Sequence, residues 1–313
     1  MSEFEIGPEP DSAARGRGLP TPIHPELVRA SRWLPRHLTN RWTLRPQRAV
    51  TAIAQRFSRR PPRAVPVSPT ASLTVFRPDA EPPQGARLPA VLWIHGGGYV
   101  AGNVQQDRER CAAMAQQTGA VVAAVSYRKA PEHPYPAALD DCLAGLRALR
   151  ALPEIDPQRV AIGGASAGGG LAAALALRVR DERDPALAAQ LLLYPMLDDR
   201  TGPPAHERNF RLWEHRSNDF AWRAYLGHAA PEAAVPARAR TLAGVAPAWI
   251  GVGTNDLFLG ESREYAARLR AAGVACDLEE VPGAWHAFDG FVPRAAVSRA
   301  FFASQYAFLR RHL

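Results

Sequence analysis

The chain has 313 residues, of which 47% are hydrophobic, enough to bury one large α/β core or two smaller ones. Its formal charge of +8 comes almost entirely from scattered arginines, and the densest group, Arg59, Arg60 and Arg63, lacks the interleaved aromatic residues that stack on bases, so no nucleic-acid partner is predicted. Three cysteines that lie far apart along the chain predict neither a disulfide framework nor a metal site.

Residues 1–22 are rich in glycine, proline and charged residues, which is typical of a flexible tail. This stretch has no apolar core of the kind that a signal peptide requires, and no later stretch is apolar for long enough to span a bilayer. We therefore expect a cytoplasmic protein without stable membrane insertion.

Residues 23–60 carry apolar side chains at near-helical spacing, interrupted by Pro35 and Pro46. The pattern predicts two or three short amphipathic helices, which would either cover one face of the core or form a cap over a site. Prolines at positions 61, 62, 66 and 69 then indicate a linker into the first expected strand, residues 72–77.

From residue 89 onward, short apolar runs alternate with helical patterns. Apolar strands of this length, separated by helices, predict an α/β fold with a mostly parallel sheet and helices on both faces. The segment from residue 198 to about residue 240 is predicted to be irregular. The expected strands are residues 90–94, 121–126, 160–162, 190–194, 248–252 and 276–281, and the expected helices are residues 107–117, 137–151, 171–180, 261–272 and 295–311.

One serine lies between an expected strand and an expected helix in the pattern Gly164-x-Ser166-x-Gly168. Small neighbours allow the strained turn of a nucleophile elbow, which lifts the serine oxygen clear of the sheet. The helix behind it directs N–H groups and the positive end of its dipole at the same point, where a developing anion would be stabilised. The alternative interpretation is a glycine-rich turn with an incidental serine.

Further polar features follow other strands at the edge where reactive groups lie in parallel sheets. A glycine-rich loop contains Gly96 and Gly97, whose amides would form an oxyanion hole together with that of Ala167. Asp256 and His286 each come after a later strand, in the chain order that the α/β-hydrolase topology requires of a triad. Four such features at successive strand ends predict a serine hydrolase.

Four segments resemble the hormone-sensitive-lipase-like family of α/β-hydrolases, the bacterial family IV esterases. These segments are residues 95–99, 126–141, 163–170 and 281–288. The resemblance runs from about residue 70 to the C-terminus. It implies an α/β-hydrolase fold with a helical cap: residues 61–313 would form the catalytic domain, residues 23–60 the cap helices, and a region at about 198–240 a further cap segment.

The same resemblance implies a serine carboxylesterase that needs no metal or organic cofactor. Its catalytic residues would be Ser166 as nucleophile, His286 as base and Asp256 as the partner of the histidine, and the oxyanion hole would be formed by the three amides named above. The chain departs from the family pattern at Ala165 and Gly260, where acidic residues are usual. These departures bear on the hydrogen bonds that support the triad, and so on the rate more than on the reaction.

Short- to medium-chain acyl esters are the expected substrates. Two alternatives stay open: an amidase or deacylase that cleaves N-acyl bonds with the same triad, and a small-molecule receptor on the same fold. The presence of His286 argues against the receptor, because relatives that became receptors lost this histidine. The sequence leaves open the physiological substrate and whether the chain forms a homodimer.

Overall fold

The computed structural model describes residues 21–36, 39–56, 64–80, 85–204 and 207–313. The predicted flexible tail lies outside these residues, apart from its last two positions. So does the predicted boundary at residue 61. Within the described ranges, the strands form one eight-stranded sheet at the centre of the molecule, in the order β1-β2-β4-β3-β5-β6-β7-β8. Its strands are β1 (Ala64–Pro66), β2 (Ser72–Phe76), β3 (Leu88–Ile94), β4 (Val121–Ser126), β5 (Ile155–Ala165), β6 (Gln190–Leu193), β7 (Ala248–Asn255) and β8 (Cys276–Trp285).

The sheet is mostly parallel. In the described part of the chain, only the pairs β1–β2 and β2–β4 are antiparallel, and β3 to β8 all run in one direction. Ile94 at the end of β3 is paired with Gly164 near the end of β5, so the loops that follow these strands lie side by side. The parallel register therefore collects the polar strand ends at one edge, as the sequence predicts.

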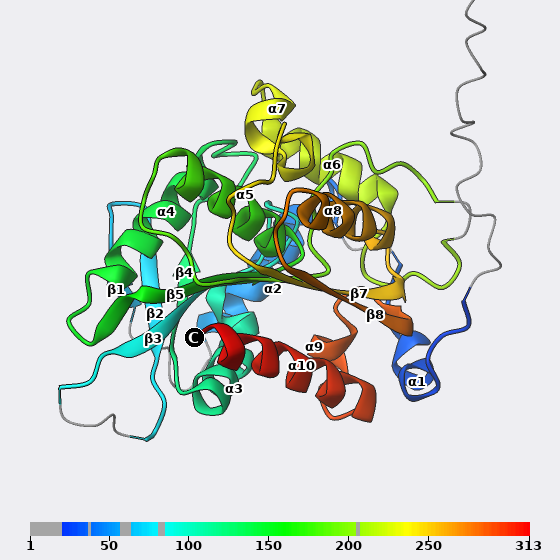
Figure 1. The fold of residues 1–313 in the computed structure, drawn as a ribbon. Helices are drawn as coiled ribbons and strands as arrows, with labels where there is room; N and C mark the ends of the chain where they lie inside the picture. The colour runs from blue at the N-terminus through cyan, green and yellow to red at the C-terminus, as the bar shows by residue number, and fades with distance from the viewer. Residues whose placement is uncertain (1–20, 37–38, 57–63, 81–84, 205–206) are drawn as a thin grey trace, which may run out of the picture.

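Helices cover both faces of the sheet (Figure 1). On one face lie α4 (Ala137–Arg150), α5 (Ala167–Asp181) and α8 (Leu259–Ala271), and on the other lie α3 (Arg108–Thr118) and α10 (Ala296–His312). Two buried apolar clusters fill the spaces between sheet and helices, one on each face. Burial on both faces explains why the parallel strands consist of nearly continuous apolar residues.

The segment predicted to be irregular between residues 198 and 240 contains helices, so that expectation was wrong. It forms α6 (His215–Leu226), α7 (Pro231–Ala234) and a 3₁₀ turn at Pro236–Arg238. The buried face of α6 includes Ser217 and Asn218 beside its apolar residues, and its N-cap is Glu214 instead of one of the usual short capping residues. Both features weaken the periodic pattern from which a helix is recognised.

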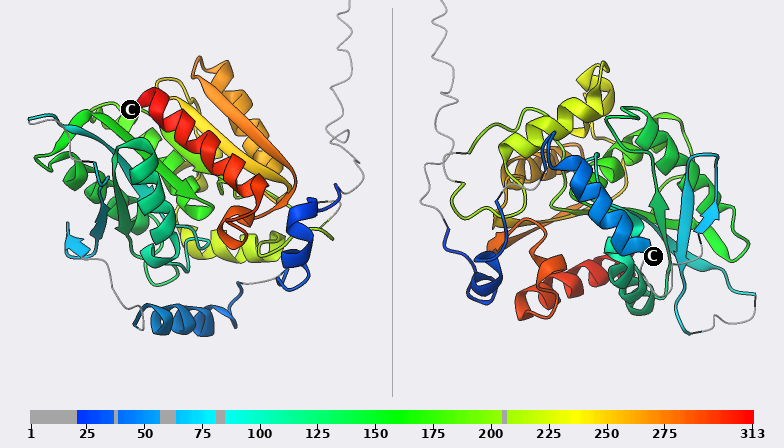
Figure 2. Two further views of the ribbon diagram at one scale, coloured as in Figure 1. Left: turned by 90° about the horizontal axis from the view of Figure 1, so that it is seen from below. Right: turned by 180° about the vertical axis from the view of Figure 1, so that it is seen from behind.

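The N-terminal segment forms a 3₁₀ turn (Pro25–Leu27), α1 (Val28–Ser31) and α2 (Leu44–Arg56), in agreement with the expected short helices. Figure 2 shows α1 and α2 on one side of the molecule, where α6 and α9 (Phe288–Phe291) also lie. The side chain of Asn40 accepts hydrogen bonds from the N–H groups of Trp42 and Thr43 ahead of α2. Among the described residues, no helix is both long enough and apolar enough to cross a membrane.

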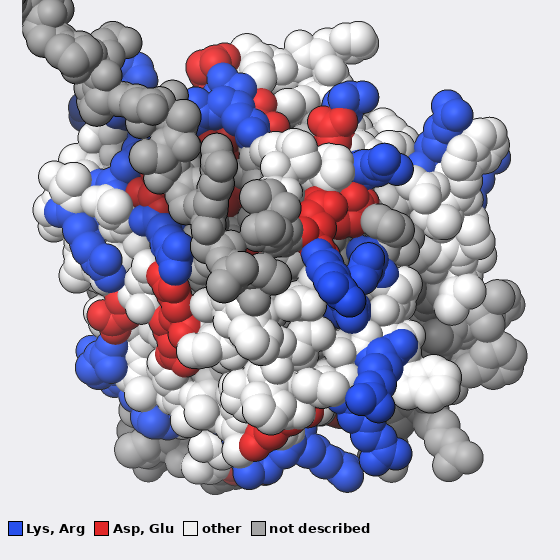
Figure 3. All heavy atoms as spheres, turned by 90° about the vertical axis from the view of Figure 1, so that its right-hand side faces the viewer, with Lys and Arg blue, Asp and Glu red and all other residues white. Residues whose placement is uncertain are grey.

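Charged side chains are mixed over the face drawn in Figure 3, where basic and acidic groups alternate over much of the described surface. Ion pairs join charged side chains of the described residues, as between Arg263 and Glu280 and between Arg238 and Asp199. The described residues on this face form no continuous basic stripe of the kind that follows a nucleic-acid backbone.

Candidate active site

Ser166 occupies a strained turn between β5 and α5. Its backbone has φ 57° and ψ −122°, a region that residues with a side chain seldom adopt and that costs roughly 1–3 kcal/mol. The surrounding backbone holds it there: the Ser166 N–H donates to Leu193 O (2.9 Å), and the Ser166 carbonyl accepts from Met196 N (3.0 Å). A Cβ at Gly168 would lie 2.0 Å from Ile94 O, so glycine is required for α5 to begin this close to β3.

The side chains of Ser166, His286 and Asp256 form a continuous hydrogen-bonded line. Ser166 Oγ lies 3.0 Å from His286 Nε2, and His286 Nδ1 lies 2.8 Å from Asp256 Oδ2. Because an ionised carboxylate can only accept, Nδ1 carries the proton and Nε2 is left to accept from the serine. All three residues are at least 93% buried, and Asp256 Oδ1 also accepts from Phe258 N (3.0 Å), which fixes the carboxylate.

The glycine loop after β3 lies directly against the elbow. A Cβ at Gly96 would be 3.3 Å from the Ser166 Cβ, and Gly97 has φ +125°, with no room for a Cβ beside Ala101 O. Ala167 is the first residue of α5, a position whose N–H has no partner within the helix. The three residues predicted for an oxyanion hole thus belong to the two loops that meet at Ser166.

These loops open into a pocket of about 330 Å³. It contains the Ser166 and His286 side chains together with residues of the N-terminal segment and of the stretch ahead of α6. Its walls include Thr39, Gln47, Gly96, Gly97, Gly98, Tyr194, Leu212, Trp213 and Phe291.

His95, which precedes the glycines, is fully buried and supports the loop from behind. Its Nδ1 lies 2.8 Å from Gly96 O, and its ring stacks on Tyr127 with 4.3 Å between centroids. Burial, with a smaller contribution from the charge of Lys129, lowers the pKa of His95 from 6.5 to about 3. The imidazole is therefore neutral at physiological pH.

We expect His95 to make the fold acid-sensitive. Below about pH 6.5 the unfolded chain binds a proton at this residue, whereas the folded chain does so only near pH 3, so the free energy of unfolding falls by up to about 1.4 kcal/mol per pH unit in this window. Urea unfolding at pH 7 and pH 5 should show a loss about 2 kcal/mol larger in the wild type than in His95→Asn. Equal losses in the two proteins would contradict this assignment.

A buried ion pair that the sequence analysis did not identify supports the histidine loop. Asp289, three residues after His286, is fully buried; it accepts from Tyr194 Oη (2.9 Å) and from Arg110 Nη2 (2.9 Å). The Tyr194 ring packs edge-on against His286, with 4.9 Å between centroids. In the sequence, the only sign of this supporting role is that Asp289 comes three residues after His286. Arg110 and Tyr194 belong to elements that are distant along the chain.

Glu261 is the second carboxylate near Asp256 in sequence, but its side chain contacts Leu197 and Thr201 and not His286. Its carboxylate accepts from Leu197 N (2.7 Å) and from Thr201 Oγ1, and burial raises its pKa well above the usual range. Leu197 follows Met196, whose N–H donates to the Ser166 carbonyl, so Glu261 holds the loop beside the elbow. Of these two carboxylates, Asp256 is the one placed against His286.

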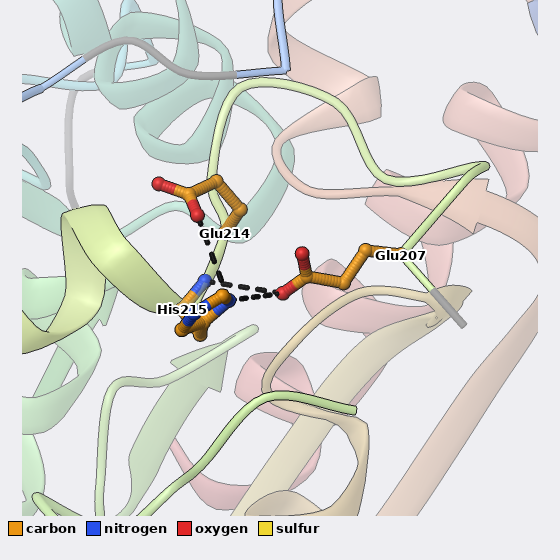
Figure 4. A group of neighbouring side chains, drawn as sticks. All are labelled: Glu207, Glu214 and His215. Carbon is orange, nitrogen blue, oxygen red and sulfur yellow. Dashed lines mark hydrogen bonds and ion pairs between the residues drawn. The ribbon is translucent and has the colours of Figure 1, made fainter. Parts of the chain in front are cut away.

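Glu207, Glu214 and His215 form a further titratable cluster at the start of α6 (Figure 4). His215 Nδ1 lies 2.7 Å from Glu207 Oε1 and 3.7 Å from Glu214 Oε2. The Glu214 carboxylate also accepts from the N–H groups of Arg216 and Ser217. Both carboxylate oxygens of Glu214 thus cap α6, and this capping role explains why Glu214 lies beside His215.

Comparison with known proteins assigns the chain to a family. The sequence model of the family described as "alpha/beta hydrolase fold" matches residues 91–290. The chain belongs to this family. The resemblance to hormone-sensitive-lipase-like esterases drawn from the motifs is confirmed, as is the predicted α/β-hydrolase fold.

Named relatives in this alpha/beta hydrolase family include esterases. The chain is 35% identical to Esterase LipI of Mycobacterium tuberculosis over 218 residues, which are 67% of this chain and 68% of that protein. It is 36% identical to Carboxylesterase NlhH of the same species over 228 residues, 67% of this chain and 70% of that protein. Among solved structures it superposes on one titled "Bacterial Heroin Esterase" with a TM-score of 0.83 and 32% identity, covering 93% of this chain and 98% of the other.

Proposed function

We propose that this protein is a serine carboxylesterase that hydrolyses short- to medium-chain acyl esters through an acyl-enzyme. The observation that carries the proposal is the line from Ser166 Oγ through His286 to Asp256, which opens into a pocket at the carboxyl edge of the sheet. The named esterases among the relatives support the same reaction class.

In the proposed mechanism, Ser166 Oγ attacks the ester carbonyl carbon while His286 Nε2 takes its proton. Asp256 keeps the ring in the tautomer that accepts at Nε2 and stabilises the imidazolium that forms. His286 then returns the proton to the departing alkoxide, and the alcohol leaves an acyl group on Ser166. A water molecule attacks this acyl-enzyme by the same sequence, which releases the carboxylic acid and restores the serine.

The oxyanion of each tetrahedral intermediate would be stabilised by the amides of Gly96, Gly97 and Ala167. The Ser166 N–H is already engaged with Leu193 O, which leaves the first amide of α5 as the donor on that side. The glycine loop is rigidly held through His95 and Tyr127, whose hydroxyl donates to His95 O (2.9 Å). Preorganised donors of this kind supply a large share of the rate enhancement because they need not reorient during the reaction.

We assign the cap to the N-terminal segment together with the stretch leading into α6. Thr39 and Gln47 from the first, and Leu212 and Trp213 from the second, line the pocket with the triad. Arg48 ties α2 to the glycine loop, because its Nε donates to Val100 O (2.7 Å). A cap attached in this way leaves a pocket of modest volume, about 330 Å³.

Acyl chain length should therefore have an optimum. Each methylene that enters the pocket contributes about 0.8 kcal/mol, or roughly fourfold in kcat/KM, until about 330 Å³ are filled. Initial rates on p-nitrophenyl esters from acetate to palmitate should rise over the first few carbons and then fall. Faster hydrolysis of emulsified long-chain triglyceride than of soluble butyrate or hexanoate esters would refute the proposed substrate class.

The same triad could cleave N-acyl bonds, so a matched series of p-nitroanilides belongs in the experiment. We expect ester turnover to exceed anilide turnover at every acyl length. Faster anilide cleavage would make an amidase the better assignment, and tight binding of both series without turnover would favour a receptor.

A further inference from the structure

The outer surface of the N-terminal segment has an unusual composition. Residues 27–78 contain eleven arginines and no aspartate or glutamate. Trp33 and Trp42 are 86% and 75% exposed, and Val50 on α2 is 66% exposed. We call this the Arg/Trp surface; besides these three residues it comprises the exposed Arg29, Arg32, Arg36, Arg41 and Arg45.

The attachment of α2 explains why its apolar groups face solvent. Leu44 is buried, and Arg48 donates to Val100 O (2.7 Å) and Ala130 O (2.6 Å), so this face of the helix is held against the glycine loop. Val50 on α2 and Trp42, two residues ahead of the helix, are left exposed. Figure 2 shows α1 and α2 together on one side of the molecule, where both can meet the same partner.

We propose that the Arg/Trp surface binds the anionic headgroups of a lipid bilayer, with Trp33 and Trp42 inserted at the interface. Arginines beside an anionic membrane are attracted to its surface potential, and indole rings favour the boundary between headgroups and acyl chains. The Arg41 guanidinium lies 4.7 Å above the Trp42 ring, so the two groups form one amphipathic unit. The binding is peripheral and reversible, and it does not depend on the proposed esterase activity.

Other occupants fit this surface less well. A second copy joined through the same face would place arginines against arginines, since residues 27–78 contain no acidic side chain. A nucleic acid would engage the arginines but would gain nothing from the exposed aliphatic side chain of Val50. An anionic bilayer satisfies both the charge and the apolar groups.

Binding by this surface would orient the pocket. Thr39 and Gln47, which line the pocket beside Ser166, belong to the same N-terminal segment as the arginines and tryptophans. The pocket entrance would then lie close to the bilayer, where esters with an apolar acyl group accumulate.

The test uses the full chain in a sedimentation assay with large vesicles, either of phosphatidylcholine alone or of phosphatidylcholine mixed with phosphatidylglycerol. We expect binding to the mixed vesicles only, weakened by added salt. Arg32→Gln/Arg41→Gln should lower the affinity roughly 25-fold, about fivefold for each arginine. Trp33→Ala/Trp42→Ala should lower it by about tenfold or more.

A control of equal charge is Arg87→Gln/Arg183→Gln, in which two exposed arginines outside the Arg/Trp surface are changed. It should bind within about twofold of the wild type. Thermal unfolding by circular dichroism establishes that each variant is folded, independently of catalysis. The proposal is overturned if the wild type does not bind the mixed vesicles. It is also overturned if Arg87→Gln/Arg183→Gln loses as much affinity as Arg32→Gln/Arg41→Gln. It is also overturned if the tryptophan variant instead abolishes a dimer or RNA binding that the wild type shows without vesicles.

Discussion

Ser166→Ala is expected to lower kcat for ester hydrolysis by about 10⁴- to 10⁶-fold. The substitution removes the oxygen that would form the acyl-enzyme and leaves His286, the glycine loop and the pocket in place. Residual turnover above that of water should remain, because the oxyanion donors and the binding pocket still act on the substrate. Rates on p-nitrophenyl butyrate, with background hydrolysis subtracted, measure the effect.

Ser298→Ala is a matched control, since this serine is also buried but lies in α10, away from the pocket. We expect it to retain kcat within about twofold, with any effect confined to stability. A Ser166→Ala protein that keeps more than a few per cent of wild-type turnover would show that another group is the nucleophile.

Asp256→Asn should cost about 10⁴-fold in kcat. An asparagine amide beside His286 Nδ1 can donate to it, which favours the tautomer that carries the proton on Nε2 and cannot accept from Ser166. The amide also no longer stabilises the imidazolium that forms in the transition state. The shape of the site is unchanged, so KM should change far less than kcat.

The informative comparison for this variant is Glu261→Gln. The Glu261 carboxylate contacts Leu197 N and Thr201, so its replacement perturbs the loop beside Ser166 and does not act directly on His286. We expect a loss at least a hundredfold smaller than that of Asp256→Asn. A large loss at Glu261 together with a small one at Asp256 would transfer the role of histidine partner to Glu261.

Much of this fold could be predicted from sequence because local and global preferences agree. The parallel strands are apolar runs buried on both faces, and α3, α4, α8 and α10 begin and end within two residues of their predicted limits. Strand ends in a parallel sheet meet at one edge, so Ser166, Asp256 and His286 could be expected to lie together before any distance was known.

Other features depend on contacts that sequence patterns do not encode. Prolines at positions 61, 62, 66 and 69 predict a linker, whereas the structure has the edge strand β1 at Ala64–Pro66. An edge strand tolerates proline, and Pro66 ends β1. The support of His286 by Asp289, Arg110 and Tyr194 joins three elements that are distant along the chain. Helix α6 carries polar residues on its buried face and therefore lacks a clear apolar period.

The most direct measurement of the central proposal is covalent labelling with a p-nitrophenyl alkylphosphonate, which mimics the tetrahedral intermediate, followed by peptide mapping by mass spectrometry. The proposal predicts stoichiometric release of p-nitrophenol, complete loss of esterase activity, and a single adduct on the peptide that contains Ser166. An adduct on another residue with Ser166 unmodified, or full labelling of Ser166 with esterase activity retained, would contradict it.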